Sequence, residues 1–244
     1  MNGSATAGSF SAGNVLNYTS TKEAELGQLL STRDGRVFRY VKAGASALVV
    51  GNVIQAPAQV TTHQQLTPAV AAIGARTITV TLGASNAATA NQYAGGWAII
   101  DTAPGLGYAY PIASHPAANA AASMVLTLQP DALVQVALTA SSRVSLVPNP
   151  YSGVIQSPVT TLTGSVVGVA VSAIPANNYG WIQISGPGAV LIAGTPGVGL
   201  AVVVPATAAG AVVVDGAAAA TKVIGSMLVT GVDGKVQGVL LDIQ

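Results

Sequence analysis

The longest uncharged stretch of the chain, between Arg143 and Asp215, is broken by prolines at a regular interval. Pro187, Pro196 and Pro205 are nine residues apart, and glycines and short runs of valine, isoleucine and alanine lie between them. Because proline cannot continue a helix or donate to the inner ladder of a sheet, each apolar run can form only a short element. Short β-branched runs bounded by proline and glycine predict β-strands joined by tight turns.

The same spacing argues against a membrane span. A transmembrane helix needs about 20 mostly apolar residues in succession, and breaks this frequent would leave backbone groups unpaired in lipid. Residues 1–6 (MNGSAT) have neither the basic region nor the apolar core of a secretory signal. We therefore expect a soluble protein with no membrane partner.

Alternation of residue types identifies further strands. Ile78, Val80 and Leu82 alternate with threonines, which predicts a half-buried strand at residues 76–82. Apolar runs at spacings of roughly 8–12 residues are typical of a β-sandwich or barrel. They predict strands at residues 125–128, 132–139, 143–147, 166–174, 188–193, 199–204, 211–214, 222–230 and 235–243.

The expected fold class is mainly β, with antiparallel β-sandwich or barrel units, two in tandem, an extended N-terminal arm and a few short helical turns. A Ser20-x-x-Glu23 capping box and the pair Thr67-Pro68 predict the helical turns. The stiff run at residues 147–151 (VPNPY) cannot continue a ladder and predicts a domain boundary. The predicted parts are an arm with a charged hairpin (residues 1–43), a first β-rich domain (44–148) and a second β domain (149–244).

Two similar phrases contain the two tryptophans of the chain. Residues 91–97 (NQYAGGW) and 177–181 (NNYGW) both place Asn before Tyr and Gly before Trp, and an apolar run follows each. We interpret them as a duplicated β unit in which Trp97 and Trp181 begin strands near the core. Because tryptophan and tyrosine also stack on sugars, a carbohydrate platform is the alternative.

Charge is concentrated near the N-terminus. The chain has nine basic and eight acidic residues, and eight of these lie within residues 22–42. The Asp-Gly pair at 34–35, between apolar runs, predicts a hairpin, and a two-residue turn would place Arg33 opposite Arg36. Guanidinium groups pair bidentately with carboxylates, so this hairpin is either a partner-binding site or a solvated tip. The candidate partner-binding residues are Arg33, Arg36, Arg39 and Lys42.

Few residues in this sequence could perform chemistry. His63 and His115 are the two histidines, and there is no cysteine. There is no Gly-x-Ser-x-Gly elbow or phosphate-binding glycine loop, and the acidic residues are too scattered for a zinc site. His63 fits a polar loop and His115 a turn before Pro116. We expect no enzymatic activity, no cofactor and no bound metal, and the formal net charge of +1 predicts no nucleic-acid partner.

The composition predicts an oligomer. Charged residues make up 7% of the chain and apolar residues 50%, whereas soluble domains are about 25% charged. A free monomer with so few surface charges would be poorly soluble. We therefore expect a homo-oligomer, with a trimer favoured, whose interfaces are built from the Ala/Val-rich strands.

Several phrases carry a resemblance to a known class of protein. They are residues 34–40 (DGRVFRY), 179–183 (YGWIQ), and 223–235 (VIGSMLVTGVDGK) followed by 239–243 (VLLDI). Together with the uncharged, cysteine-free, Ala/Gly/Val/Thr-rich character of most of the chain, they resemble the head decoration, or cement, proteins of tailed bacteriophages.

The resemblance implies a structural virion protein that binds the outer surface of a phage capsid and stabilises it, often as a trimer. The implied partner is the major capsid protein. The implied location is the outer capsid surface of the virion, after synthesis in the bacterial host cytoplasm. No catalytic residues are implied. The alternative function is that of a virion or cell-surface adhesin that binds glycans.

Overall fold

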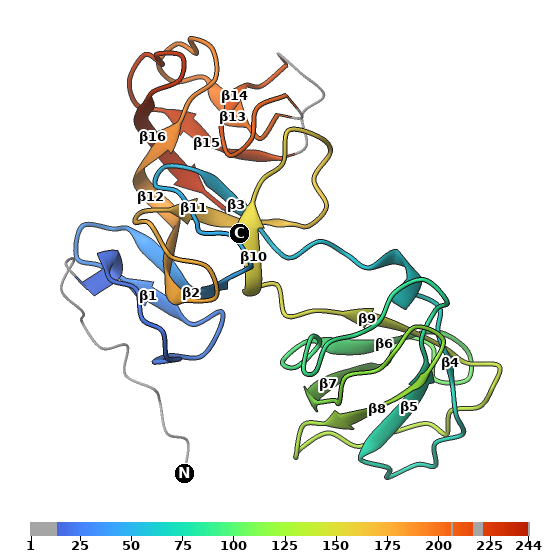
Figure 1. Cartoon of the computed structure of the whole chain (residues 1–244). Coiled ribbons are helices and arrows are strands. Elements are labelled where there is room, and N and C mark those ends of the chain that lie inside the picture. Colours follow the sequence, from blue (N-terminus) through green and yellow to red (C-terminus); the bar gives the residue numbers. More distant parts are fainter. Residues whose placement is uncertain (1–13, 206, 217–221, 244) are drawn as a thin grey trace. The chain divides into compact units, whose positions relative to one another are not determined.

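The computed structural model describes residues 14–205, 207–216 and 222–243. As predicted, the fold is mainly β (Figure 1). The chain forms a discontinuous unit of residues 1–57 and 150–244 and an inserted unit of residues 58–149. The tandem arrangement predicted from the sequence is therefore wrong, although a boundary does lie close to residue 148. Residues 44–57 belong with the C-terminal half because β3 (Val53–Gln55) pairs with β10 (Ser152–Gln156) and β11 (Val166–Ala170) of that half.

Five strands of the discontinuous unit form a closed ring. Each pairs with the next in the order β2-β10-β3-β11-β12, and β12 pairs back with β2. All of these ladders are antiparallel except that of β2 with β10. The strands are β2 (Val37–Ala43), β3 (Val53–Gln55), β10 (Ser152–Gln156), β11 (Val166–Ala170) and β12 (Tyr179–Leu191), and β1 (Leu29–Ser31) pairs with the outer edge of β2.

Small apolar side chains fill this ring. Val41, Ile54, Val154 and Ile182 come from four different strands and are fully buried in one cluster. The diameter of a barrel grows with the number of its strands, so a five-stranded ring has little internal space. This explains why the chain uses valine, isoleucine and alanine here and places its aromatic residues elsewhere.

Strand β12 also belongs to a second ring. Its C-terminal half pairs with β16, and the order continues through β15 and β13 to β14. A parallel bridge joins Val212, directly before β14, to Ile192, directly after β12, and this bridge closes the ring. Val190, Ile224 and Val239 are fully buried in the core of this ring. The added strands are β13 (Ala201–Val203), β14 (Val213–Val214), β15 (Val223–Met227) and β16 (Val236–Asp242).

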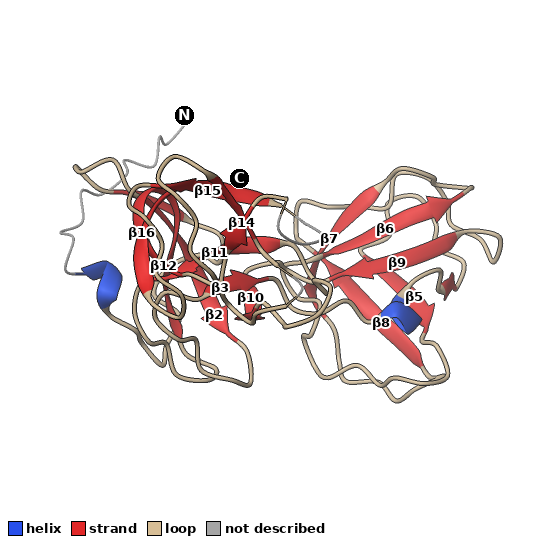
Figure 2. Ribbon diagram, turned by 90° about the horizontal axis from the view of Figure 1, so that it is seen from above, coloured by secondary structure: helices blue, strands red, loops and turns tan. Residues whose placement is uncertain are grey.

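The inserted unit is a separate closed sheet (Figure 2). Its strand order is β4-β5-β8-β7-β6-β9, and an antiparallel bridge between Leu66 and Val144 joins the two ends. Ile78, Ile100 and Leu126 are fully buried in its core. Its strands are β4 (Thr67–Pro68), β5 (Thr77–Thr81), β6 (Trp97–Thr102), β7 (Ala109–Ser114), β8 (Ser123–Leu128) and β9 (Arg143–Val147).

One turn recurs throughout both units. Three isolated bridges join Leu48 to Ile174, Ala71 to Leu138 and Ala88 to Ala118, and in each pair the two residues exchange backbone hydrogen bonds. The turn begins directly after each of these six residues. In every case the next four residues form a turn closed by a hydrogen bond from the fourth N–H to the first carbonyl. The turn at residues 139–142 lacks a positive φ at its third residue, Ser141. In the other five turns the third residue has a positive φ, at Gly51, Gly74, Asn91, Ala121 and Asn177. These are type II turns, which favour Gly or Asn at that place.

This turn explains the repeated phrase of the sequence. Asn91 and Asn177, which open the two phrases, have φ values of 59° and 62° at equivalent turn positions. The tryptophans that follow do not share an environment. Trp97 begins β6 on its outer face and is 40% exposed, while Trp181 lies within β12 and is half-buried. The prediction that both tryptophans lie near the core is therefore wrong for Trp97, because Ala98 and Ile100 take the inward positions of β6.

Several local predictions also fail. Thr67-Pro68 forms strand β4 and not a helical turn, and residues 24–26 contain only a bend and a turn. Residues 132–139 form a loop with a single bridge at Leu138. Residues 1–13 of the predicted arm lie outside the described residues. The described helical turns are η1 (Asn14–Leu16), whose Val15 is fully buried against Leu30 and Phe38, and η2 (Thr61–His63).

Two buried histidines flank Tyr93 in the inserted unit. The Tyr93 hydroxyl lies 2.5 Å from His63 Nδ1, and His63 Nε2 lies 3.1 Å from the Asn86 carbonyl oxygen. Since a carbonyl can only accept, Nε2 carries the proton and Nδ1 accepts from the tyrosine. The Tyr93 backbone N–H donates to His115 Nε2 (2.9 Å), and His115 Nδ1 donates to the Pro116 carbonyl (2.8 Å). Both histidines are therefore hydrogen-bonded core residues, His115 is neutral because its Nε2 accepts from an N–H, and burial raises the pKa of Tyr93 to about 12.

We predict that the inserted unit loses stability at mildly acidic pH. Burial, with a smaller contribution from His63, lowers the pKa of His115 below its ordinary value of 6.5. As pH falls below 6.5, His115 therefore binds a proton in the unfolded chain but not in the folded unit. Stability is constant above this pH and falls as pH drops toward the pKa of the folded state. Urea unfolding at about pH 7.5 and about pH 5.5 measures the effect above the range of ordinary carboxyl titration.

The matched variant is His115→Gln, which can accept from the Tyr93 N–H but does not titrate. We expect it to show a smaller difference between the two urea midpoints than the unmodified protein. Equal pH dependence in the two proteins would contradict the assignment to His115.

Candidate functional site

The predicted hairpin is present, but its loop differs from the predicted one. Leu30 pairs with Phe38 in the ladder, and the Thr32 N–H donates to the Arg36 carbonyl (2.9 Å). The loop therefore has three residues, 33–35, and Thr32 rather than Arg33 lies opposite Arg36. A three-residue hairpin loop takes a glycine of positive φ at its last position, and Gly35 has a φ of 82°. The prediction that Arg33 lies opposite Arg36 is therefore wrong.

Arg36 is paired within this loop. Its Nε lies 2.7 Å from Asp34 Oδ2, and its guanidinium lies over the ring of Phe38. A hydrogen bond from Thr32, followed by the contacts of Arg36, holds the pKa of Asp34 below its usual value of 3.8. Arg33 is exposed at the tip and makes no hydrogen bond, ion pair or ring contact with the described part of the chain.

The two remaining predicted cations contact aromatic rings of the same unit. Arg39 Nη1 donates to the Tyr151 hydroxyl (2.7 Å), and the guanidinium carbon lies 4.7 Å from the centroid of that ring. Lys42 Nζ lies 5.7 Å from the ring centroid of Tyr179. The four predicted residues therefore do not form one basic cluster, and Arg33 is the member whose charge is most accessible to a partner.

The described residues bring together no group of three His, Cys, Asp or Glu side chains that could hold a metal ion. The Asp101 side chain hydrogen-bonds Ser145 on the neighbouring strand β9. His63 and His115 are hydrogen-bonded to Tyr93. None of the described helices is long and apolar enough to cross a membrane.

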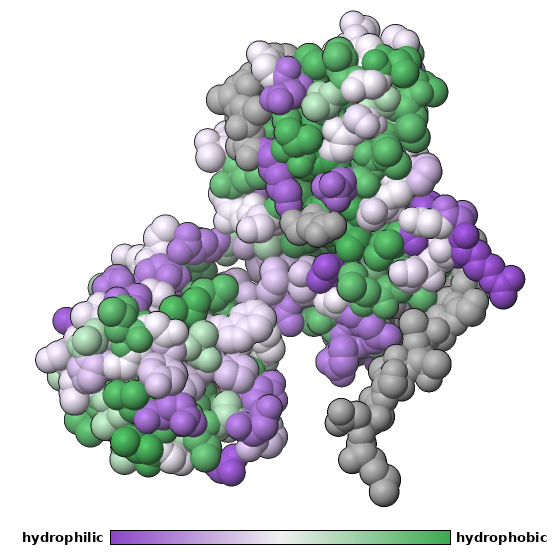
Figure 3. All heavy atoms as spheres, turned by 180° about the vertical axis from the view of Figure 1, so that it is seen from behind, coloured by the Kyte–Doolittle hydropathy of each residue, from purple (hydrophilic) through white to green (hydrophobic). Residues whose placement is uncertain are grey.

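An apolar face covers part of the second ring of the discontinuous unit. Leu228 follows β15, and its N–H donates to the Gly238 carbonyl of β16 (3.0 Å). Leu200 is adjacent, since its carbonyl accepts from the Met227 N–H (3.0 Å). Figure 3 shows apolar residues gathered over this lobe. We define the apolar face as the exposed residues Val236 and Leu240 of β16 together with Leu228 and Val229, which adjoin the outward side of Gly238 between them.

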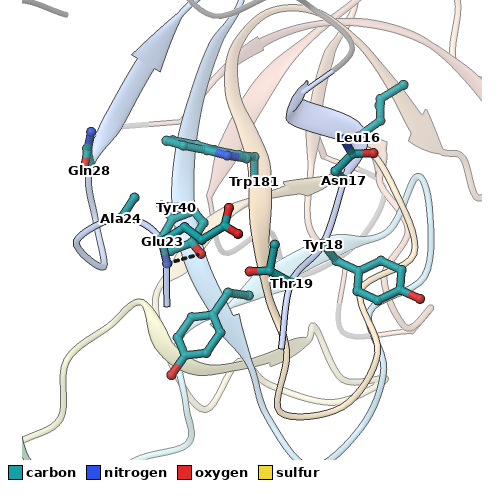
Figure 4. A pocket seen from close by; sticks show the side chains of 10 residues that line it. Leu16, Asn17, Tyr18, Thr19, Glu23, Ala24, Gln28, Tyr40 and Trp181 are labelled. Atoms are coloured by element: carbon teal, nitrogen blue, oxygen red, sulfur yellow. Dashed lines mark hydrogen bonds between the residues drawn. The ribbon is translucent and has the colours of Figure 1, made fainter. Parts of the chain in front are cut away.

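A second surface feature is a pocket that we call the aromatic pocket (Figure 4). It has a volume of about 710 Å³ and lies between the N-terminal segment and strands β2 and β12. The ring planes of Tyr40 and Tyr179 are 11° apart with centroids separated by 6.1 Å, and Trp181 lies 5.0 Å from Tyr40 at 59°. The remaining lining residues are 16–19, Glu23, Ala24 and Gln28.

The sequence had identified only one side of this pocket. Tyr179 and Trp181 belong to the phrase at residues 177–181, one of the two phrases for which a sugar platform is the alternative interpretation. Tyr40 comes from the charged hairpin, and residues 16–19 come from the predicted arm. The Thr19–Tyr179 bridge brings these distant segments together, and no spacing rule could have predicted this long-range pairing.

Comparison of the chain with models of protein families, with curated proteins and with solved structures finds no match.

We predict that Arg39 contributes to stability and Arg33 does not. Arg39→Ala removes a hydrogen bond and a cation–π contact with Tyr151, so the free energy of unfolding should fall by about 1–2 kcal/mol. Arg33→Ala should change it by less than about 0.5 kcal/mol, as for an isolated surface substitution. Urea unfolding of both variants provides the measurement. Equal effects would show that Arg39 is as solvated as Arg33.

Proposed function

We propose that this protein is a structural virion protein that binds the outer surface of a phage capsid and stabilises it. In this proposal it acts as a homo-oligomer, with a trimer favoured, and its partner is the major capsid protein. The observation that carries the proposal is the apolar face. Exposed apolar patches of this kind on soluble proteins mark sites of protein association.

The makeup of the apolar face supports burial in an assembly. Its four members are aliphatic, and each is 44% exposed on a chain that is only 7% charged. Apolar surface removed from water contributes roughly 25 cal/mol per Å² to association. A second copy of the chain is the occupant that explains both the face and the scarcity of surface charge.

The capsid contact is a separate part of the proposal. Arg36, Arg39 and Lys42 have partners within the chain, so the exposed guanidinium of Arg33 is the group that we assign to carboxylates of the capsid. Guanidinium suits this role because it pairs bidentately with carboxylate. The resemblance of the sequence phrases to phage decoration proteins supports the identity of the partner.

We predict that the unmodified protein sediments as an oligomer of its 24.0 kDa chain. Leu228→Glu, which buries an unpaired charge in the proposed interface, should weaken association about a hundredfold or more. Val70→Glu is the matched control, since Val70 is 79% exposed in the inserted unit and outside the apolar face. A monomeric unmodified protein at micromolar concentration would refute the oligomer.

We predict that Arg33 contributes to capsid binding through its charge. Arg33→Glu should reduce affinity for capsids of the cognate phage assembled without this protein, by roughly tenfold at low salt and less at high salt. Arg33→Lys is the control that retains charge and loses bidentate geometry, and it should have an intermediate affinity. If Arg33→Glu binds like the unmodified protein at every salt concentration, the capsid contact lies elsewhere. Failure to bind these capsids at all would overturn the proposed function.

A further inference from the structure

We propose that the aromatic pocket is a binding site for neutral carbohydrate. This inference goes beyond capsid binding and does not depend on it. It is based on the arrangement of rings and hydrogen-bonding groups in the pocket and on the absence of a basic residue among the described residues that line it.

The rings form a platform that is held in place. Tyr40 is 3% exposed and its ring contacts those of Tyr179 and Trp181, and its hydroxyl accepts a hydrogen bond from the Glu23 N–H (3.1 Å). Tyr179 and Trp181 lie on β12, are half-buried and form part of the pocket wall. An aromatic face fixed in this way can pack on the C–H face of a sugar ring with little loss of side-chain entropy.

Polar groups lie beside the platform. The indole N–H of Trp181 makes no hydrogen bond with the described residues, so it can donate to a hydroxyl. Gln28 Oε1 accepts from the Glu25 N–H (3.2 Å), which leaves its amide group to donate. The Glu23 carboxylate is a further acceptor at the pocket. Flat apolar surface beside directional donors and acceptors matches the two kinds of surface that a sugar presents.

The charge of the pocket selects against anionic ligands. Glu23 is the one ionised side chain among the described lining residues, and it would repel phosphate, sulfate or an acidic sugar. Lys22 and Lys42 are not lining residues of the pocket. Lys22 Nζ pairs with Glu25 (2.6 Å), and Lys42 Nζ lies 5.7 Å from the ring centroid of the lining residue Tyr179. The volume of about 710 Å³ lies within the usual range of small-molecule sites, about 300–1,000 Å³. A neutral oligosaccharide is the ligand class that meets all of these conditions.

The two tryptophans allow a matched test. In the full chain, Trp97→Phe leaves Trp181 as the sole indole fluorophore, and Trp181→Phe leaves Trp97 in the inserted unit. Both variants are titrated with cellotriose, maltotriose and chitotriose as neutral probes and with sialyllactose as an acidic one. We expect a saturable change in fluorescence with at least one neutral probe in the Trp97→Phe protein, and none in the Trp181→Phe protein.

Calorimetry then measures affinity for the probe that binds. Glu23→Gln, an exposed change that keeps the shape of the side chain, should lower affinity at least threefold, and Trp181→Ala at least tenfold. Trp97→Ala should leave affinity within twofold of the unmodified protein. If Trp181→Ala fails to fold, Glu23→Gln and the fluorescence pair still decide the question. Binding of none of the neutral probes, preference for sialyllactose, or equal affinity in the Glu23→Gln protein would overturn the proposal.

Discussion

The discontinuous unit depends on a single change of direction in β12. This strand is 13 residues long; it pairs with β2 up to Ser185 and with β16 from Ser185 onward. The Gln183 amide is fully enclosed at this point and lies within hydrogen-bonding distance of the carbonyl oxygens of Ser185 (3.0 Å), Gly186 (3.3 Å) and Pro187 (2.9 Å). Gly186 has a φ of 85°, which side chains other than glycine rarely adopt. The buried amide thus donates hydrogen bonds to carbonyl oxygens that lose their partners in the ladder at the bend. The same strand can therefore belong to both rings.

Closure of the rings depends on backbone pairing rather than on large side chains. Leu48 and Ile174 exchange hydrogen bonds (2.8 and 3.2 Å) and are buried with the residues that fill the first ring. The two turns that follow them are tied in a similar way: the Gly51 N–H donates to the Ala170 carbonyl, and the Asn177 N–H donates to the Gly44 carbonyl. The core of the first ring is therefore aliphatic, which fits the excess of alanine and valine and leaves Phe38 and Tyr40 outside it.

That placement links the fold to the two proposals. Aromatic side chains that do not fit inside the narrow barrel lie where the N-terminal segment covers β2 and β12. There they form the aromatic pocket. Aliphatic residues on the outer side of β16 have no such cover among the described residues, and they form the apolar face. Both features follow from a sheet that alternates inward and outward side chains while its interior accepts only small ones.

The sequence alone determined the fold class, most strand positions and the hairpin, because these depend on local signals. Proline and glycine spacing limited element length, and alternation at residues 77–81 identified the inward face of β5. It did not determine which strands pair. The insertion of one unit in the other, the exposure of Trp97 and the partners of Arg36 and Arg39 all follow from contacts between distant residues. A pairing register is selected by burial and hydrogen bonding summed over the whole sheet, and no local pattern encodes that sum.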